Sequence, residues 1–226
     1  MTEEGAELRA DARRNRERII AAAAAVLAER GADAPMEEIA RRAGVGVGTL
    51  YRRFPDRDAL FRGVMHSLLV RLTATGRRAQ AEEPDAWGAL ERFLRETAKL
   101  RTASLITVLR PRVVRSLQAD GELGVARRAW FGLLDEMVLG AQREGAMRTD
   151  LGTGDVTLMI AVFTRRVPGL PEDLAGRSLE RHLEVLLDGL RATPRRVLTS
   201  EPIHAAELEA EAMRSHHGDH QVTGSS

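Results

Sequence analysis

Residues 36–61 read MEEIARRAGVGVGTLYRRFPDRDALF, and this stretch decides the fold. Residues 36–43 have the apolar spacing of a short helix, and Gly44 follows them as a turn residue. A second short helix is expected over residues 47–53, because Pro55 disfavours the helical conformation of the residue before it. Two short helices around a glycine turn are typical of a helix-turn-helix, whose second helix enters the DNA major groove.

A longer helix is expected on each side of this motif. Residues 13–30 have helical apolar spacing, and Gly31 suits the end of that helix. Pro35 fits the first turn of the next helix, where its missing N–H costs nothing. Asp56 is a suitable N-cap for a fourth helix that fades near Gly76. The apolar stripe of that fourth helix comprises Leu60, Phe61, Val64, Leu68 and Leu72.

The rest of the chain also has helical patterns. Further helices are expected over residues 86–102, 104–117, 122–144, 155–166 and 174–192. No internal repeat and no alternating run long enough for a sheet is present in the sequence. The fold class is therefore expected to be all-α, with an N-terminal three-helix helix-turn-helix domain joined through a long fourth helix to a C-terminal helical domain.

Composition shifts along the chain predict four regions. The polar segment 80–85 is the most plausible boundary between the two domains, and Pro194 follows the last long helix. The final residues, SHHGDHQVTGSS, have the composition of a disordered tail. We expect a flexible N-terminus over 1–12, a DNA-binding domain with its linking helix over 13–79, a regulatory and dimerisation domain over 80–192, and a largely disordered tail over 193–226.

The charge distribution supports this division weakly. The chain has a net charge of +1, yet residues 1–79 contain 15 Arg against 11 acidic residues. A positive N-terminal domain on a near-neutral remainder suits a protein that reads DNA. There are no cysteines, which excludes disulfides, thiolate metal sites and cysteine nucleophiles.

The sequence gives no sign of a membrane protein. No apolar run approaches the roughly 20 residues that a bilayer-spanning helix needs. The acidic start, MTEEGAE, lacks the plan of a secretory signal. We therefore expect a cytoplasmic location and no membrane partner.

Catalytic and metal chemistry are the weaker interpretations. No nucleophile-elbow sequence and no glycine-rich nucleotide-binding loop is present. His216, His217 and His220 have a spacing that could bind a metal, but a disordered His-rich end is favoured. We expect no enzyme activity, no catalytic residue, no metal and no cofactor.

Several segments together resemble the N-terminal domain of TetR-type transcriptional regulators. An apolar helix closes on AERG, and EEIARRAGV, VGTLYRRF and DRDALF follow with matching spacing of glycines, aromatics and apolar residues. The resemblance covers about a fifth of the chain. Two residues depart from the family pattern: Pro35 stands where members often have Ser or Thr, and Val47 stands where they often have Lys or another polar residue.

The motif and the resemblance together nominate a DNA-contacting set. Gly46 and Gly48 would let backbone N–H groups approach a phosphate, and Val47 can meet only apolar groups such as a thymine methyl. Thr49 suits a phosphate or a base edge, and the resemblance assigns Tyr51 to the DNA backbone. Basic residues complete the set. The nominated residues are Gly46, Val47, Gly48, Thr49, Tyr51, Arg52, Arg53 and Arg57.

Simpler interpretations of these residues stay open. Gly44 is above all a tight-turn residue, and Gly46 and Gly48 can be explained the same way. Tyr51 can be half-buried packing. A further group of arginines precedes the first helix's core and is more readily explained as a solvated face than as a phosphate contact. These arginines are Arg13, Arg14, Arg16 and Arg18.

For the second domain, the resemblance implies a homodimer and an effector pocket. The last two helices would form a four-helix bundle with a partner subunit, so that two heads read a near-palindromic double-stranded operator. A small-molecule effector would bind between the central helices and change the spacing of the heads. Candidate lining residues are Trp87, Phe93, Leu105, Leu109, Trp130, Phe131, Leu134 and Met137, with Arg110 or Asp135 as a polar anchor. An ordinary hydrophobic core explains each of them equally well.

The function expected is that of a DNA-binding regulator, a repressor released from its operator when a small molecule binds. The alternative is a helical small-molecule or protein-binding module whose DNA-binding domain is degenerate, an idea motivated only by Val47 and Pro35.

Overall fold

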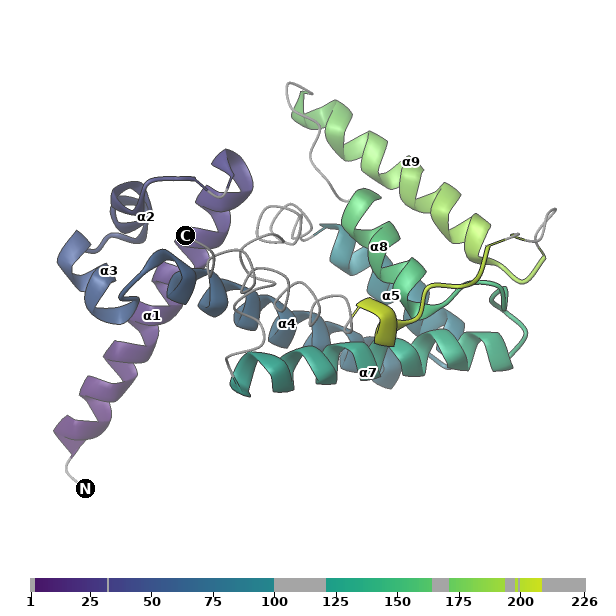
Figure 1. Ribbon diagram of the computed structural model, residues 1–226, viewed down its shortest axis with the longest axis horizontal. Helices are drawn as coiled ribbons and strands as arrows, with labels where there is room; N and C mark the ends of the chain where they lie inside the picture. Colours follow the sequence, from purple (N-terminus) through teal and green to yellow (C-terminus); the bar gives the residue numbers. More distant parts are fainter. Residues whose placement is uncertain are drawn as a thin grey trace, which may run out of the picture.

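The computed structural model describes residues 3–31, 33–99, 121–163, 171–193, 198 and 200–208. Long helices dominate the described chain (Figure 1). Their bounds are α1 Glu3–Arg30, α2 Met36–Ala43, α3 Val47–Arg53, α4 Arg57–Glu82, α5 Ala86–Lys99, α7 Gly121–Arg143, α8 Thr153–Phe163 and α9 Glu172–Leu190.

The first three helices pack around the beginning of α4 and form what we call the head. Its centre is fully apolar, as the periodicity of each helix predicts. The side chains of Ile19, Leu27, Ile39, Leu50 and Phe61 are completely buried there. Burying a side chain of this size contributes roughly 1.5–3 kcal/mol, so these five residues alone explain why the short helices α2 and α3 hold their places.

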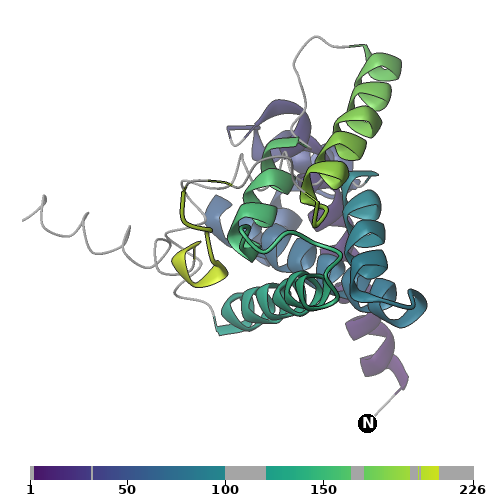
Figure 2. The ribbon, with the colours of Figure 1, turned by 90° about the vertical axis from the view of Figure 1, so that its right-hand side faces the viewer.

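The rest of the described chain, which we call the body, is built on α4, α5 and α7 (Figures 1 and 2). Helices α4 and α7 lie side by side and run in the same direction, with Gly76 beside Leu133, and the start of α5 meets α7 where Ala86 lies beside Gly140. The hydrophobic core continues without a break from the head into the body. Because α4 contributes to both parts, it connects them mechanically.

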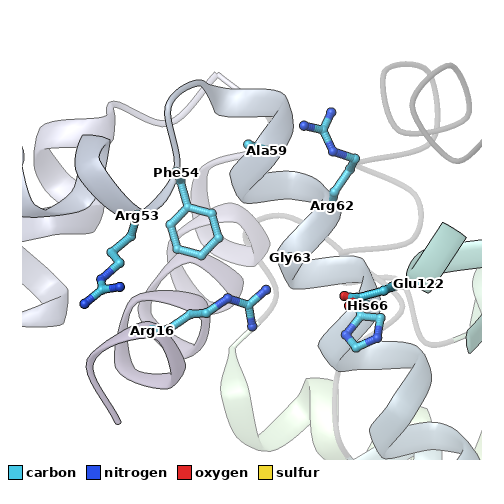
Figure 3. A pocket seen from close by; sticks show the side chains of 8 residues that line it. All are labelled: Arg16, Arg53, Phe54, Ala59, Arg62, Gly63, His66 and Glu122. Atoms are coloured by element: carbon cyan, nitrogen blue, oxygen red, sulfur yellow. The ribbon is translucent and has the colours of Figure 1, made fainter. Parts of the chain in front are cut away.

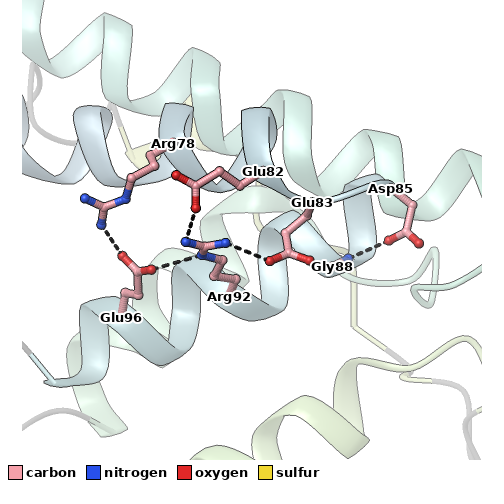
Figure 4. Close-up of polar contacts among 7 residues, drawn as sticks. All are labelled: Arg78, Glu82, Glu83, Asp85, Gly88, Arg92 and Glu96. Atoms are coloured by element: carbon pink, nitrogen blue, oxygen red, sulfur yellow. Dashed lines mark hydrogen bonds and ion pairs between the residues drawn. The ribbon is translucent and has the colours of Figure 1, made fainter.

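An ion-pair cluster ties the end of α4 to α5 (Figure 4). The Arg92 guanidinium contacts Glu82, Glu83 and Glu96, and Arg78 contacts Glu96 at 2.5 Å. Hydrogen bonds from Arg92, and then from Arg78, hold the pKa of Glu96 below its ordinary value. The cluster lies on the surface, so it fixes the geometry of the turn between the helices more than it adds stability.

Helices α8 and α9 close the body. Met147 and Arg191 form a single antiparallel bridge, and the Arg148 side chain donates to Asp150 at 2.5 and 2.7 Å. Residues 200–208 lie across the start of α8, where the Asp155 carboxylate accepts from the backbone N–H of Ile203 at 2.9 Å. Gly152 and Gly154 leave the space that the Ile203 carbonyl occupies.

The all-α class and the order of the helices are confirmed, and the predicted stripe of α4 is buried. Two ends differ from prediction. The first helix begins at Glu3 rather than at residue 13, so residues 3–12 of the segment expected to be flexible are helical. Helix α4 continues to Glu82 instead of ending near Gly76, because Gly76 is buried against Leu133.

The tail also departs from prediction. Residues 200–208 pack on the body, and Ala205 is buried, so this part of the largely disordered region expected over 193–226 is structured. The helix expected over 104–117 and the histidines His216, His217 and His220 lie outside the described residues. Within the described residues, no helix combines the length and the apolarity that crossing a bilayer requires.

Candidate nucleic-acid interface

Gly44 makes the turn between α2 and α3. Its φ of 66° lies in the left-handed region, which a glycine adopts without a steric penalty. The Gly44 N–H donates to the carbonyls of Ala40 and Arg41, and the Val45 N–H donates to Ala40 at 3.0 Å. These bonds satisfy the open end of α2 and set the angle at which α3 leaves it.

Helix α3 is attached to the head through Leu50, which is fully buried, and through Phe54 just after its end. Its opposite face is open to solvent. Val47 and Tyr51 are 37% and 42% exposed, and Thr49 is half-buried. The remaining predicted contacts on this face are all exposed: Gly46, Gly48, Arg52 and Arg53.

The two glycines at the start of α3 differ from Gly44. Neither Gly46 nor Gly48 has a positive φ, and an added Cβ would meet no atom within 4 Å at either position. The turn explanation therefore holds for Gly44 alone. A bare backbone at an exposed helix start does suit close approach of a phosphate.

Ion pairs distinguish the arginines of α2 from the arginines of α3. Arg42 pairs with Glu29, and Arg30 pairs with Glu38 at 2.6 Å, so the charges between α1 and α2 are largely neutralised. Among the described residues, no carboxylate forms a salt bridge with Arg52 or Arg53. Their guanidinium groups are available for phosphates or base edges.

Arg57 is placed differently from the other predicted contacts. It is half-buried, and its Nη1 donates to the Ala34 carbonyl at 2.7 Å. The Asp56 side chain accepts from the Ala59 N–H at 2.6 Å and caps α4. In this structure Arg57 therefore ties the start of α4 to the loop after α1.

The arginines of α1 are mainly on a solvated face, as the simpler interpretation holds. Arg13 lies 3.7 Å from Glu17, Arg14 pairs with Asp11, and Arg18 is exposed. Arg16 is the exception, because its guanidinium lies over the Phe54 ring, 5.6 Å from the centroid.

The predicted pocket residues of the body are part of its core. Trp87, Phe93, Trp130, Leu134 and Met137 are buried, and the Phe93 and Trp130 rings lie 5.3 Å apart at 46°. Phe131 packs at the edge of the core, and Asp135 is half-buried. Leu105, Leu109 and Arg110 lie outside the described residues.

Two buried polar residues of the body were missed from the sequence. Arg127 is only 8% exposed, and Thr97 is 3% exposed with no hydrogen-bond partner for its Oγ1 in the described structure. Arg127 lies one helical turn before Trp130, on the same face of α7. The i, i+3, i+7 spacing of Arg127, Trp130 and Leu134 is the signal that would have found it.

Within the described residues, no group of three or more histidines and carboxylates is arranged to hold a metal ion.

Comparison with known proteins identifies the family. Residues 19–64 match the model of bacterial regulatory proteins, tetR family. An uncharacterised HTH-type transcriptional regulator from Mycobacterium bovis is 30% identical over 134 residues, covering 58% of this chain and 69% of that protein. A TetR transcriptional regulator from Streptomyces coelicolor is 32% identical, with 80% of this chain and 99% of that chain covered at a TM-score of 0.56.

A more distant structure shares the fold. FadR from Bacillus subtilis, solved in complex with stearoyl-CoA, is 19% identical, with 77% of this chain and 98% of that chain covered at a TM-score of 0.55. The helix-turn-helix geometry, the helical body and the relatives at 30% identity or more agree. The chain belongs to the TetR family of bacterial regulatory proteins.

Proposed function

We propose that this protein is a transcriptional repressor that binds operator DNA through α3 and is released when a small molecule binds the body. The observation that carries the proposal is the exposed face of α3, where Thr49, Arg52 and Arg53 lie on a rigidly packed helix. Thr49 and Tyr51 supply hydrogen-bonding hydroxyls, and the arginines supply charge. Since Val47 offers only apolar contact, base reading rests mainly on Arg52 and Arg53. DNA binding also places the site of action with the chromosome, in the cytoplasm.

The exposed apolar side chains of the last two helices support a homodimer. Val162 on α8 is 68% exposed and Val185 on α9 is 71% exposed, with Leu174 also open to solvent. We propose that α8 and α9 of two subunits pack together there. A twofold axis would then present two heads to a near-palindromic operator.

The effector is proposed to bind among α4, α5 and α7. The buried aromatic pair Phe93 and Trp130 would contact its apolar part, and Thr97 and Arg127 would contact a polar group. FadR from Bacillus subtilis, which shares the fold, was solved in complex with stearoyl-CoA, and this supports a small-molecule effector. Because α4 packs in both cores, a shift of α4 would change the head's orientation.

The test is a mobility-shift assay on DNA flanking the protein's own gene. A Thr49→Ala/Arg52→Ala double variant should lose at least tenfold in affinity, since each removed contact to a phosphate or base is worth about 1–3 kcal/mol. The matched control is Arg71→Ala, an exposed arginine of α4 outside the interface, which should bind like the wild type.

Equal DNA binding by the double variant and the wild type would contradict the proposal. Absence of DNA binding by the wild type would instead favour the alternative in which the head is degenerate and the body alone binds a partner. The relatives are transcriptional regulators, and we assign no catalytic role to any residue.

A further inference from the structure

An open hollow of about 210 Å³ lies where the head meets the body (Figure 3). Helices α1, α4 and α7 border it: α1 contributes Arg16, α4 contributes Arg62 and His66, and α7 contributes Glu122. Arg53, the last residue of α3, and Phe54 close the remaining side. The hollow is smaller than the roughly 300 Å³ at which drug-sized pockets begin, so it suits a compact ligand.

The lining of this hollow is strongly basic. Within the described residues, Arg16, Arg53 and Arg62 form no salt bridge, and Glu122 is the one acidic residue of the lining. Guanidinium groups bind phosphate oxygens in pairs, with a fixed fork geometry. The charge and the donor type therefore favour a phosphate-bearing anion.

One of these arginines is held in place. The Arg16 guanidinium lies over the Phe54 ring, and its Nη2 is 3.7 Å from where a Cβ would stand on Gly63. That Cβ would come within 2.9 Å of the Phe54 ring, so Gly63 allows the ring to lie close to α4. Figure 3 shows Arg16 directed toward Gly63, at the floor of the hollow.

The hollow begins at Arg53, at the end of the exposed face of α3, and extends along α4 toward the body. Arg62 and His66 come five and nine residues after Arg57, which places them about 8 and 14 Å further along the α4 axis. Glu122 of α7 also lines the hollow (Figure 3).

We propose that this hollow, which we call the joint site, binds a small anion that carries two linked phosphates, either pyrophosphate or the diphosphate part of a nucleotide. Figure 3 shows Arg16, Arg53 and Arg62 on different sides of the hollow, and their guanidinium groups would turn toward it to bind the phosphate oxygens, with His66 at the far end. Arg53 also belongs to the exposed face of α3, so an occupied joint site competes with DNA for it. This competition rests on the proposed function, whereas the binding of the anion does not.

The first experiment is isothermal titration calorimetry of the full chain with sodium pyrophosphate, without DNA and against sodium chloride of equal ionic strength. We expect saturable binding of one pyrophosphate per chain, weakened at least tenfold by Arg62→Gln, since a hydrogen bond to a charged group is worth about 1.5–3 kcal/mol. Arg71→Gln makes the same charge change on an exposed residue of α4 outside the hollow and should leave the affinity unchanged.

No saturable heat, or an equal loss in both variants, would overturn the joint site. Thermal unfolding followed by circular dichroism checks that Arg62→Gln is folded, and Arg62→Lys, which keeps the charge but loses the fork, replaces it if it is not. A titration with ADP separates the sources: tighter binding than pyrophosphate indicates a nucleotide, and equal binding indicates that the diphosphate suffices.

The second experiment measures DNA binding with and without pyrophosphate at constant ionic strength. Pyrophosphate should weaken DNA binding by the wild type and not by Arg62→Gln. If pyrophosphate does not bind alone and Arg62→Gln lowers the salt dependence of DNA binding, the hollow holds a DNA phosphate and the proposal is wrong. Absence of any DNA binding would count against the proposed function only, because the calorimetric result is independent of it.

Discussion

The three glycines between α2 and the first turn of α3 have different roles in the helix-turn-helix. Gly44 is required by its positive φ, whereas Gly46 and Gly48 have ordinary backbone angles and open space around them. Only the first of these could be assigned from sequence, because a residue just past a helix end has a known conformational preference. The other two are explained only once the exposed face of α3 is seen.

Gly44→Ala should destabilise the protein by about 1–2 kcal/mol, the cost of placing a Cβ in the left-handed region. Urea unfolding measures the change. Gly48→Ala is the control, because it adds a better helix former at an exposed helical position and should not destabilise the fold. Equal destabilisation by both substitutions would contradict this distinction.

Asp150 should make the stability of the body depend on pH. The Arg148 guanidinium, and then the Leu198 N–H, hold the pKa of this carboxyl well below its ordinary value. A lowered folded-state pKa means that the ionised group stabilises the fold above about pH 3.9, the value in an unfolded chain, and that this contribution is lost as the pH falls further.

Asp150→Asn should therefore lower the urea midpoint at pH 7, and the difference from the wild type should shrink between pH 4 and pH 2. A difference that stays constant over that range would show that the lost stability has another origin than the charge. Asp188→Asn, on an exposed residue of α9, is the matched control.

At the scale of the helices, close packing of α4, α5 and α7 depends on two glycines whose role no sequence pattern reveals. An added Cβ would lie 2.6 Å from the Leu133 side chain at Gly76 and 2.6 Å from the Ala86 Cβ at Gly140. Leu133 can rotate away, but the Ala86 Cβ is fixed to its backbone. The pair Gly140 and Ala86 therefore sets how closely the start of α5 approaches α7.

Gly140→Ala should destabilise the protein by about 1–3 kcal/mol through overpacking. Gly132→Ala makes the same change in the same helix, at an exposed position with nothing within 4 Å, and should stabilise it by up to about 1 kcal/mol. Thermal unfolding of the two variants compares them directly, and a shift of the same sign in both would refute the packing argument.

Helix existence could be predicted from apolar periodicity, while helix ends could not. Residues 3–12 are polar, and the sequence predicts a flexible segment there. They nevertheless extend α1, and Arg14 pairs with Asp11 on its surface. Gly76 looked like a helix end, but its lack of a side chain serves a neighbour distant in sequence. Both errors arise because tertiary contacts override local preference.

For the whole molecule, α4 is the structural link between the proposed DNA contacts and the proposed effector site. Its first half packs in the head and its second half in the body, within a single continuous core. The proposed DNA contacts could be nominated from sequence because the motif places most of them on one short helix. The buried Arg127 and the joint site could not, because they arise from residues that only the folded chain brings together.

The proposed dimer gives a direct test at this scale. Val185→Glu places a charge in the centre of the proposed α8 and α9 interface and should convert the dimer to a monomer in light scattering after size exclusion. Leu139→Glu makes the same apolar-to-charged change at an exposed residue of α7. The protein should then keep the molecular mass of a dimer. Monomeric wild-type protein at micromolar concentration would contradict the interface.

The central claim is that the exposed face of α3 contacts DNA phosphates and bases. It is tested most directly by the salt dependence of operator binding, measured by fluorescence anisotropy for the wild type and Arg52→Gln. Each phosphate contact contributes about 0.9 to the slope of log K against log salt. If Arg52 contacts a phosphate, the slope should fall by about one per subunit; if it reads a base, affinity should fall at an unchanged slope. An unchanged slope together with unchanged affinity would contradict the account.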